Sequence, residues 1–148
     1  MSNTPKKETQ IVGNTGMYYV CYQLSRMGLN VMPTARNARG VDVIAYSLDS
    51  GKYCGIQVKT LSCRNVVPLG NDLNKISGDF WVVVILPQTE SPDSPTIYVL
   101  TPGNVKDLSH RTTNEKGVVS FWLKPNKYRE YENNWDIIRK KLGVLNHE

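Results

Sequence analysis

The stretch Ile56-Gln57-Val58-Lys59 alternates apolar and polar side chains. Successive side chains of a β-strand point to opposite faces, so Gln57 and Lys59 would share one face while Ile56 and Val58 meet the core. The longer segment 53–60 is rich in strand-forming residues and predicts a β-strand. An amide oxygen and an ammonium group would then stand side by side on its polar face.

The preceding strand, predicted over residues 41–46, carries one carboxylate, Asp42, among apolar residues. Turn residues at 47–52 predict a hairpin with a connection of about six residues. A short hairpin would bring Asp42 next to Gln57 and Lys59. The three side chains would form a small site containing one carboxylate, one neutral oxygen and one cation.

The rest of the chain predicts an α/β domain around this hairpin. Met17, Val20, Leu24 and Met27 recur at helical spacing and predict a helix over 14–27 that stops at Gly28. The apolar run 80–86 predicts a buried strand. Residues 61–79 look irregular. Further strands are expected at 29–34, 96–101 and 118–123, and further helices at 102–110 and 134–142.

A length of 148 residues fits one domain. We expect a flexible N-terminal arm over residues 1–12 and a single domain over 13–148. No apolar run is long enough to span a bilayer, and the first ten residues are polar and charged, so we expect a cytoplasmic protein without a membrane partner. The three cysteines match no zinc spacing and predict free thiols, with Cys21 and Cys54 buried.

The net charge is +5, and much of the excess lies in the first forty residues. That segment holds five basic side chains, two lysines and three arginines, against the single acid Glu8. A basic surface there is compatible with a polyanion such as a nucleic acid. Simple solubility is the alternative reading.

The order of these features resembles the PD-(D/E)XK nuclease superfamily, and in particular small bacterial and phage single-domain members with a D…QxK site. The resemblance covers roughly residues 10–142 and lies in the following segments: Leu24-Ser25-Arg26-Met27-Gly28, Thr34-Ala35-Arg36-Asn37-Ala38-Arg39-Gly40-Val41-Asp42, Gln57-Val58-Lys59-Thr60, the strand at Trp81 and the helix at Trp135. It implies a three-layer, restriction-endonuclease-like α/β core with a mixed central β-sheet flanked by helices.

The three polar residues suit metal-assisted hydrolysis of phosphodiester bonds. A hard cation such as Mg²⁺ or Mn²⁺ prefers oxygen ligands, which Asp42, Gln57 and the main-chain carbonyl of Val58 would supply. Lys59 would orient or deprotonate the attacking water, or stabilise charge on the phosphate. Asp42, Gln57 and Lys59 are therefore the predicted catalytic residues of a Mg²⁺-dependent endodeoxyribonuclease.

The predicted partner is double-stranded DNA. The residues expected to contact it are Arg36, Asn37, Arg39 and Arg64, with Lys6 and Lys7 as further members of a basic surface. A homodimer is compatible with cutting both strands.

Three departures from the family pattern leave alternatives open. Gln57 replaces an acid, no acid stands near Met17 on the first helix, and no helix is evident after the third strand. A catalytically degenerate protein that binds nucleic acid is one alternative, and a protein-interaction module, such as an inhibitor or assembly subunit, is another. Asp42 and Lys59 would then form a structural ion pair.

Overall fold

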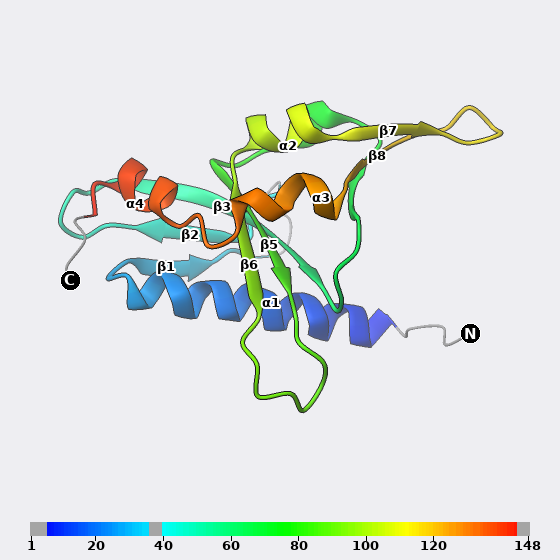
Figure 1. The fold of residues 1–148 in the computed structure, drawn as a ribbon. Coiled ribbons are helices and arrows are strands. Elements are labelled where there is room, and N and C mark those ends of the chain that lie inside the picture. The colour runs from blue at the N-terminus through cyan, green and yellow to red at the C-terminus, as the bar shows by residue number, and fades with distance from the viewer. Residues whose placement is uncertain (1–5, 36–39, 145–148) are drawn as a thin grey trace.

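The computed structural model describes residues 6–35 and 40–144, which form a mixed α/β fold with two sheets (Figure 1). The larger sheet has the strand order β1-β2-β3-β5-β6, and the smaller sheet has the order β4-β8-β7. The strands are β1 (Asn30–Pro33), β2 (Val43–Tyr46), β3 (Tyr53–Leu61), β4 (Val67–Gly70), β5 (Phe80–Ile85), β6 (Thr96–Leu100), β7 (His110–Thr113) and β8 (Val119–Leu123). The helices are α1 (Lys6–Arg26), α2 (Pro102–Leu108), α3 (Pro125–Tyr128) and α4 (Asp136–Leu142), with 3-10 turns η1 (Leu73–Lys75) and η2 (Arg129–Tyr131).

The large sheet is mixed. β2 pairs antiparallel with β3, as the predicted hairpin requires, whereas β3 pairs parallel with β5. Every residue of β5 is buried, because side chains on both of its faces are covered. The predicted mixed central sheet flanked by helices is thus confirmed.

Two apolar clusters lie on opposite sides of this sheet. Phe80, Val82 and Val84 of β5 join the cluster that contains residues of α1 and α4. The alternate β5 residues, Trp81 and Val83 among them, join the cluster that contains residues of α2, α3 and the small sheet. This alternation follows from the two-residue period of a strand and gives the fold its layers.

Helix α1 begins at Lys6, so residues 6–12 are helical and the prediction of a flexible arm over 1–12 does not hold for them. The sequence pattern did not predict that the helix extends back to Lys6, because the apolar spacing starts only at Met17. Residues 1–5 lie outside the described part of the chain.

The segment 61–79, predicted to be irregular, contains β4 and η1. Its order comes from pairing with β8, far along the chain: Val67 lies opposite Leu123, and Pro68 lies opposite Trp122. The same segment carries the chain between the parallel strands β3 and β5, where the family pattern would have a helix.

Candidate functional site

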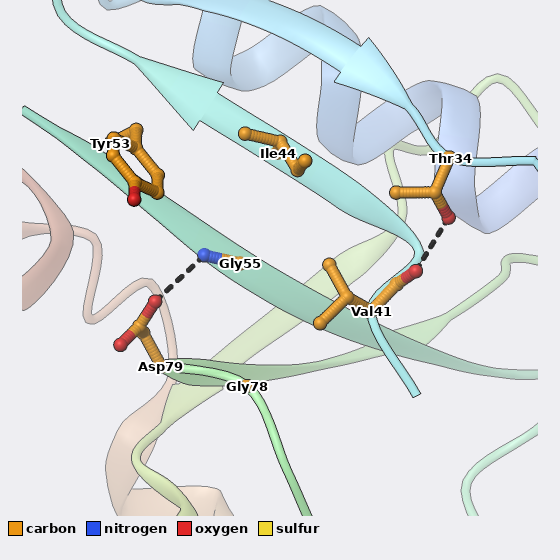
Figure 2. A pocket seen from close by; sticks show the side chains of 7 residues that line it. All are labelled: Thr34, Val41, Ile44, Tyr53, Gly55, Gly78 and Asp79. Carbon is orange, nitrogen blue, oxygen red and sulfur yellow. Dashed lines mark hydrogen bonds between the residues drawn. The ribbon is translucent and has the colours of Figure 1, made fainter. Parts of the chain in front are cut away.

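Asp42 lies directly before β2 and is held by main-chain bonds from both sides. Its N–H donates to the carbonyl of Ile56 at 2.9 Å, and its own carbonyl accepts from the N–H of Thr34 at 2.9 Å. The Thr34 hydroxyl also donates to the carbonyl of Val41 at 2.5 Å, as Figure 2 shows. Thr34 is therefore a positioning residue for Asp42. The sequence alone did not indicate this role for Thr34, because the role depends on Thr34 lying directly after the end of β1.

The carboxylate of Asp42 points to the third strand. Its Oδ2 accepts a hydrogen bond of 2.7 Å from the main-chain N–H of Val58, the residue between Gln57 and Lys59. One of the four lone-pair positions of the carboxylate is used in this way, which leaves capacity for a further partner. The Asp42 carboxylate thus meets β3 at the main chain between Gln57 and Lys59, and its convergence with their two side chains stays a prediction.

Gln57 and Lys59 line one cavity of about 240 Å³, so they do project from the same face of β3. The remaining lining residues are Pro68, Leu69, Gly70, Lys75, Ile76 and Trp81. Most of them belong to β4, η1 and the residues beside these elements. Val58, in contrast, packs into the cluster on the α1 side of the sheet.

The side-chain oxygen of Gln57 is buried and accepts no hydrogen bond from any described residue. A buried acceptor without a partner costs about 1–3 kcal/mol, which a bound cation or water would relieve. Gly40 adopts φ of +77°, and a Cβ there would lie 3.3 Å from Gln57 Oε1 and 2.7 Å from Ser77 Oγ. Glycine at position 40 therefore keeps open the space around this oxygen.

The ammonium group of Lys59 lies over the ring of Trp81, with Nζ 5.5 Å from the ring centroid. This arrangement is a cation–π interaction and leaves the charge at the cavity. Between Asp42 and Lys59, both within the described chain, no ion pair forms. The geometry thus gives no support to a structural Asp42–Lys59 pair.

The donors suit a divalent cation only weakly. Across residues 6–35 and 40–144, no group of three or more histidine, cysteine, aspartate or glutamate side chains is clustered for metal binding. The position expected to carry a helix acid is Met17, which packs against the α1-side core cluster. Asp42, Gln57 Oε1 and the Val58 carbonyl would hold Mg²⁺ or Mn²⁺ through a single negative charge, and low ligand charge means low affinity.

The predicted DNA-contacting residues are not gathered at this cavity in the described chain. Arg36, Asn37 and Arg39 lie outside the described residues. Arg64 follows β3, and its guanidinium donates to the hydroxyl of Tyr98 at 2.8 Å. Lys75, which the sequence analysis did not single out, lines the cavity beside Lys59. Its place depends on η1, for which the sequence carries no periodic signal.

A second hollow, of about 500 Å³, lies beside Val41 and Ile44 and is drawn in Figure 2. It is lined by Thr34, Val41, Ile44, Tyr53, Gly55, Gly78 and Asp79. Two of these residues are glycines, and Asp79 Oδ2 accepts from the N–H of Gly55 at 2.8 Å across its floor. The tyrosine is 71% exposed at its rim. This hollow is therefore mostly apolar.

The fold is similar to that of a solved bacterial homing endonuclease, I-Ssp6803I. The superposition has a TM-score of 0.58 at 17% identity and covers 95% of this chain and 99% of that one. A Holliday junction resolvase, Hjc of Archaeoglobus fulgidus, superposes with a TM-score of 0.47 at 13% identity over 76% of this chain and 91% of that one. No family model and no curated protein matches the sequence.

At such low identity the similarity concerns the fold alone, and it agrees with the mixed α/β core, a central sheet flanked by helices, that the sequence predicts. Among the described residues, none of the helices is long and apolar enough to cross a membrane.

Proposed function

We propose that the protein is a metal-dependent nuclease that hydrolyses DNA phosphodiester bonds. The observation that carries this proposal is the 2.7 Å bond from Val58 N–H to the Asp42 carboxylate, which fixes an anionic oxygen at the residue that follows Gln57. The side-chain oxygen of Gln57 is itself buried and unpartnered within the described chain. Anionic and neutral oxygens next to a lysine are the donor set that metal-assisted phosphate chemistry needs.

Asp42, Gln57 and the Val58 carbonyl would hold Mg²⁺ or Mn²⁺. A bound divalent ion would polarise the phosphate and lower the pKa of a coordinated water. Lys59 would hold a phosphate oxygen or orient the water. In support of this role, its charge lies at the cavity and has no carboxylate partner within the described chain. Lys75 brings a second cation to the same cavity, which favours an anionic ligand.

DNA is the proposed substrate because the chain is basic and its fold is shared with a homing endonuclease. Arg36, Asn37, Arg39 and Arg64 would contact the backbone of double-stranded DNA. A homodimer would let two sites cut both strands.

A plasmid-nicking assay with Mg²⁺, Mn²⁺ and EDTA tests the proposal. We expect relaxed circles to form with either metal, none with EDTA, and none with an Asp42→Ala variant. Wild-type protein that leaves supercoiled plasmid intact over a range of metal concentrations would end the enzymatic proposal.

A catalytically degenerate DNA-binding protein is the second candidate. Two observations favour it: the described chain has no cluster of three or more side chains suited to bind a metal, and Gln57 is neutral. Salt-dependent DNA binding without nicking would select it. If the protein neither binds nor nicks DNA, the remaining candidate is a protein-interaction module, such as an inhibitor or assembly subunit.

A further inference from the structure

Strands β7 and β8 form a hairpin that projects away from the body of the protein (Figure 1). β4 pairs with β8 only at Phe121, Trp122 and Leu123. The outer rows of the hairpin, Thr112 with Ser120 and Thr113 with Val119, therefore have only each other as strand partners. Every residue from 110 to 118 is exposed. The β7–β8 hairpin is thus a two-stranded ribbon with both faces open at its outer end.

The ribbon is ordered by its own polar bonds. The indole N–H of Trp122 donates to the hydroxyl of Thr112 at 2.8 Å. At the tip, the side-chain oxygen of Asn114 accepts from the N–H groups of Lys116 and Val118, each at 2.9 Å. Isolated hairpins are marginally stable, so these bonds and the pairing with β4 pre-organise a shape that has little core beneath it.

The exposed side chains of the ribbon are polar and basic. Over residues 110–124 the sequence carries Arg111, Lys116 and Lys124 against the single acid Glu115. Hydroxyl groups of Thr112, Thr113 and Ser120 occupy the rows between them. The core of a protein–protein interface is rich in aromatic side chains and depleted of lysine, whereas Val118 is the one large apolar residue of this ribbon that is more than half exposed.

The β7–β8 hairpin adjoins the cavity that is lined by Gln57 and Lys59. Pro68 lines that cavity and pairs with Trp122, which in turn pairs with His110 of β7. A ligand long enough to extend from the cavity onto the adjoining surface would therefore contact the β7–β8 hairpin.

We propose that the β7–β8 hairpin is a DNA-binding element that enters the major groove of a duplex engaged at the site. The inference rests on the proposed function, because the duplex is the substrate named there. A two-stranded ribbon fits a major groove about 12 Å wide and about 8.5 Å deep. The four residues from Thr112 to the tip at Glu115 extend roughly 13 Å at about 3.3 Å per residue, enough to reach the groove floor. Arg111 and Lys116 would contact phosphates, and the threonine and serine hydroxyls would face base edges.

The test compares two double variants that each remove two exposed positive charges. Arg111→Ala with Lys116→Ala alters the hairpin, and Lys106→Ala with Lys140→Ala alters α2 and α4. Fluorescence anisotropy in EDTA measures the Kd for a short duplex across a salt series, so that cleavage cannot interfere. We expect the hairpin variant to bind about ten-fold or more weakly, with a salt slope smaller by up to about two. The control variant should stay within about three-fold of wild type.

A second arm of the experiment addresses the groove. A duplex whose cytosines carry a bulky 5-substituent, which fills the major groove, should bind wild type more weakly than plain duplex, and the hairpin variant should lose most of this difference. Circular dichroism and thermal unfolding verify that both variants fold.

The outcomes separate this inference from the proposed function. Wild type that binds duplex through the hairpin but never nicks plasmid keeps the inference and removes the nuclease. Wild type that nicks plasmid while the hairpin variant binds and cuts as well as the control overturns the inference alone. A hairpin variant that changes the sedimentation of the protein but leaves its affinity for DNA intact also overturns it, and assigns the hairpin to contact between copies of the chain.

Discussion

The main-chain N–H of Val58 donates a 2.7 Å hydrogen bond to the carboxylate of Asp42, across the junction of β2 and β3. Asp42 therefore has two tasks in the proposed enzyme. It accepts the hydrogen bond of a β3 main-chain N–H just before β2 begins, and it presents the one carboxylate among the proposed metal ligands. The two tasks can be separated, because the first needs only an oxygen and the second needs a negative charge.

Asp42→Asn should abolish cleavage without unfolding the protein. The asparagine oxygen can still accept from Val58 N–H, so we expect the free energy of unfolding to stay within about 1 kcal/mol of wild type. Loss of the anionic ligand should lower the rate of nicking about 100-fold or more. Urea unfolding and a nicking time course measure the two effects. Asp42→Ala, which also removes the acceptor, should lose about 1–3 kcal/mol of stability. An Asp42→Asn protein that nicks at the wild-type rate would contradict the metal-ligand role.

Gln57→Glu should lower the metal concentration that the enzyme needs. The change places a carboxylate where a buried, unpartnered amide oxygen now lies, and Lys59 and Lys75 in the same cavity offset the added charge. Hard cations bind anionic oxygen more tightly, so the Mg²⁺ concentration for half-maximal nicking should fall about ten-fold. A Mg²⁺ titration of the nicking rate is the measurement. Gln57→Leu, the control, should raise that concentration, and equal metal dependence in all three proteins would remove Gln57 from the site.

Alanine substitutions at two glycines of α1 should change the free energy of unfolding in opposite directions. Gly16 faces Thr60 of β3 so closely that a Cβ would collide with the threonine side chain, whereas Gly13 has open space around it. Gly16→Ala should therefore push α1 away from β3 and cost about 1–3 kcal/mol of unfolding free energy. Gly13→Ala should gain about 0.5–1 kcal/mol, because alanine is the better helix former. Urea unfolding of both variants checks the contact, and equal stabilisation by the two changes would show that α1 does not rest on β3 at Gly16.

The stability of the protein should fall as the pH rises above about 9. Burial, helped by the charge of Asp79, raises the pKa of the Cys54 thiol to about 12 from an ordinary value of 9.0. Burial also raises the pKa of Cys21. Between these values the unfolded chain has released the Cys54 proton and the folded chain has kept it, so the folded state loses up to about 1.4 kcal/mol per pH unit for that group. Urea unfolding between pH 8 and pH 10 measures the slope, and Cys54→Ala should reduce it.

The cysteines also offer a direct check on burial. Cys63 is exposed, whereas Cys21 and Cys54 are buried. Iodoacetamide at pH 8 should modify Cys63 in the folded protein and all three cysteines in urea, as mass spectrometry would show. Rapid alkylation of Cys54 in the folded protein would mean that β2 and β3 do not pack as described.

The sequence predicted the parts of the molecule that local patterns control. The alternation at Ile56–Lys59 predicted that Gln57 and Lys59 share one face of β3, and the short turn before it predicted the β2–β3 hairpin that brings Asp42 to the β3 main chain. It did not predict the small sheet, because β4 is short, contains Pro68 and Gly70, and becomes a strand only by pairing with β8. For the same reason it missed Lys75, whose position in the cavity depends on that pairing. Arg64 was expected to contact DNA because of its charge alone. In the structure its guanidinium donates a hydrogen bond to the hydroxyl of Tyr98.

The pairing of Val67 with Leu123 has a consequence for synthesis of the chain. β2 and β3 are neighbours in sequence, so the hairpin that carries Asp42 can close soon after residue 61 leaves the ribosome. β4, which lines the cavity, can pair only after β8 has been synthesised, and β8 emerges only when most of the chain has been made. A nascent chain would thus hold its carboxylate in place while the cavity around Gln57 and Lys59 is still open. Chains truncated before β8 should therefore be inactive, even with every proposed metal ligand present.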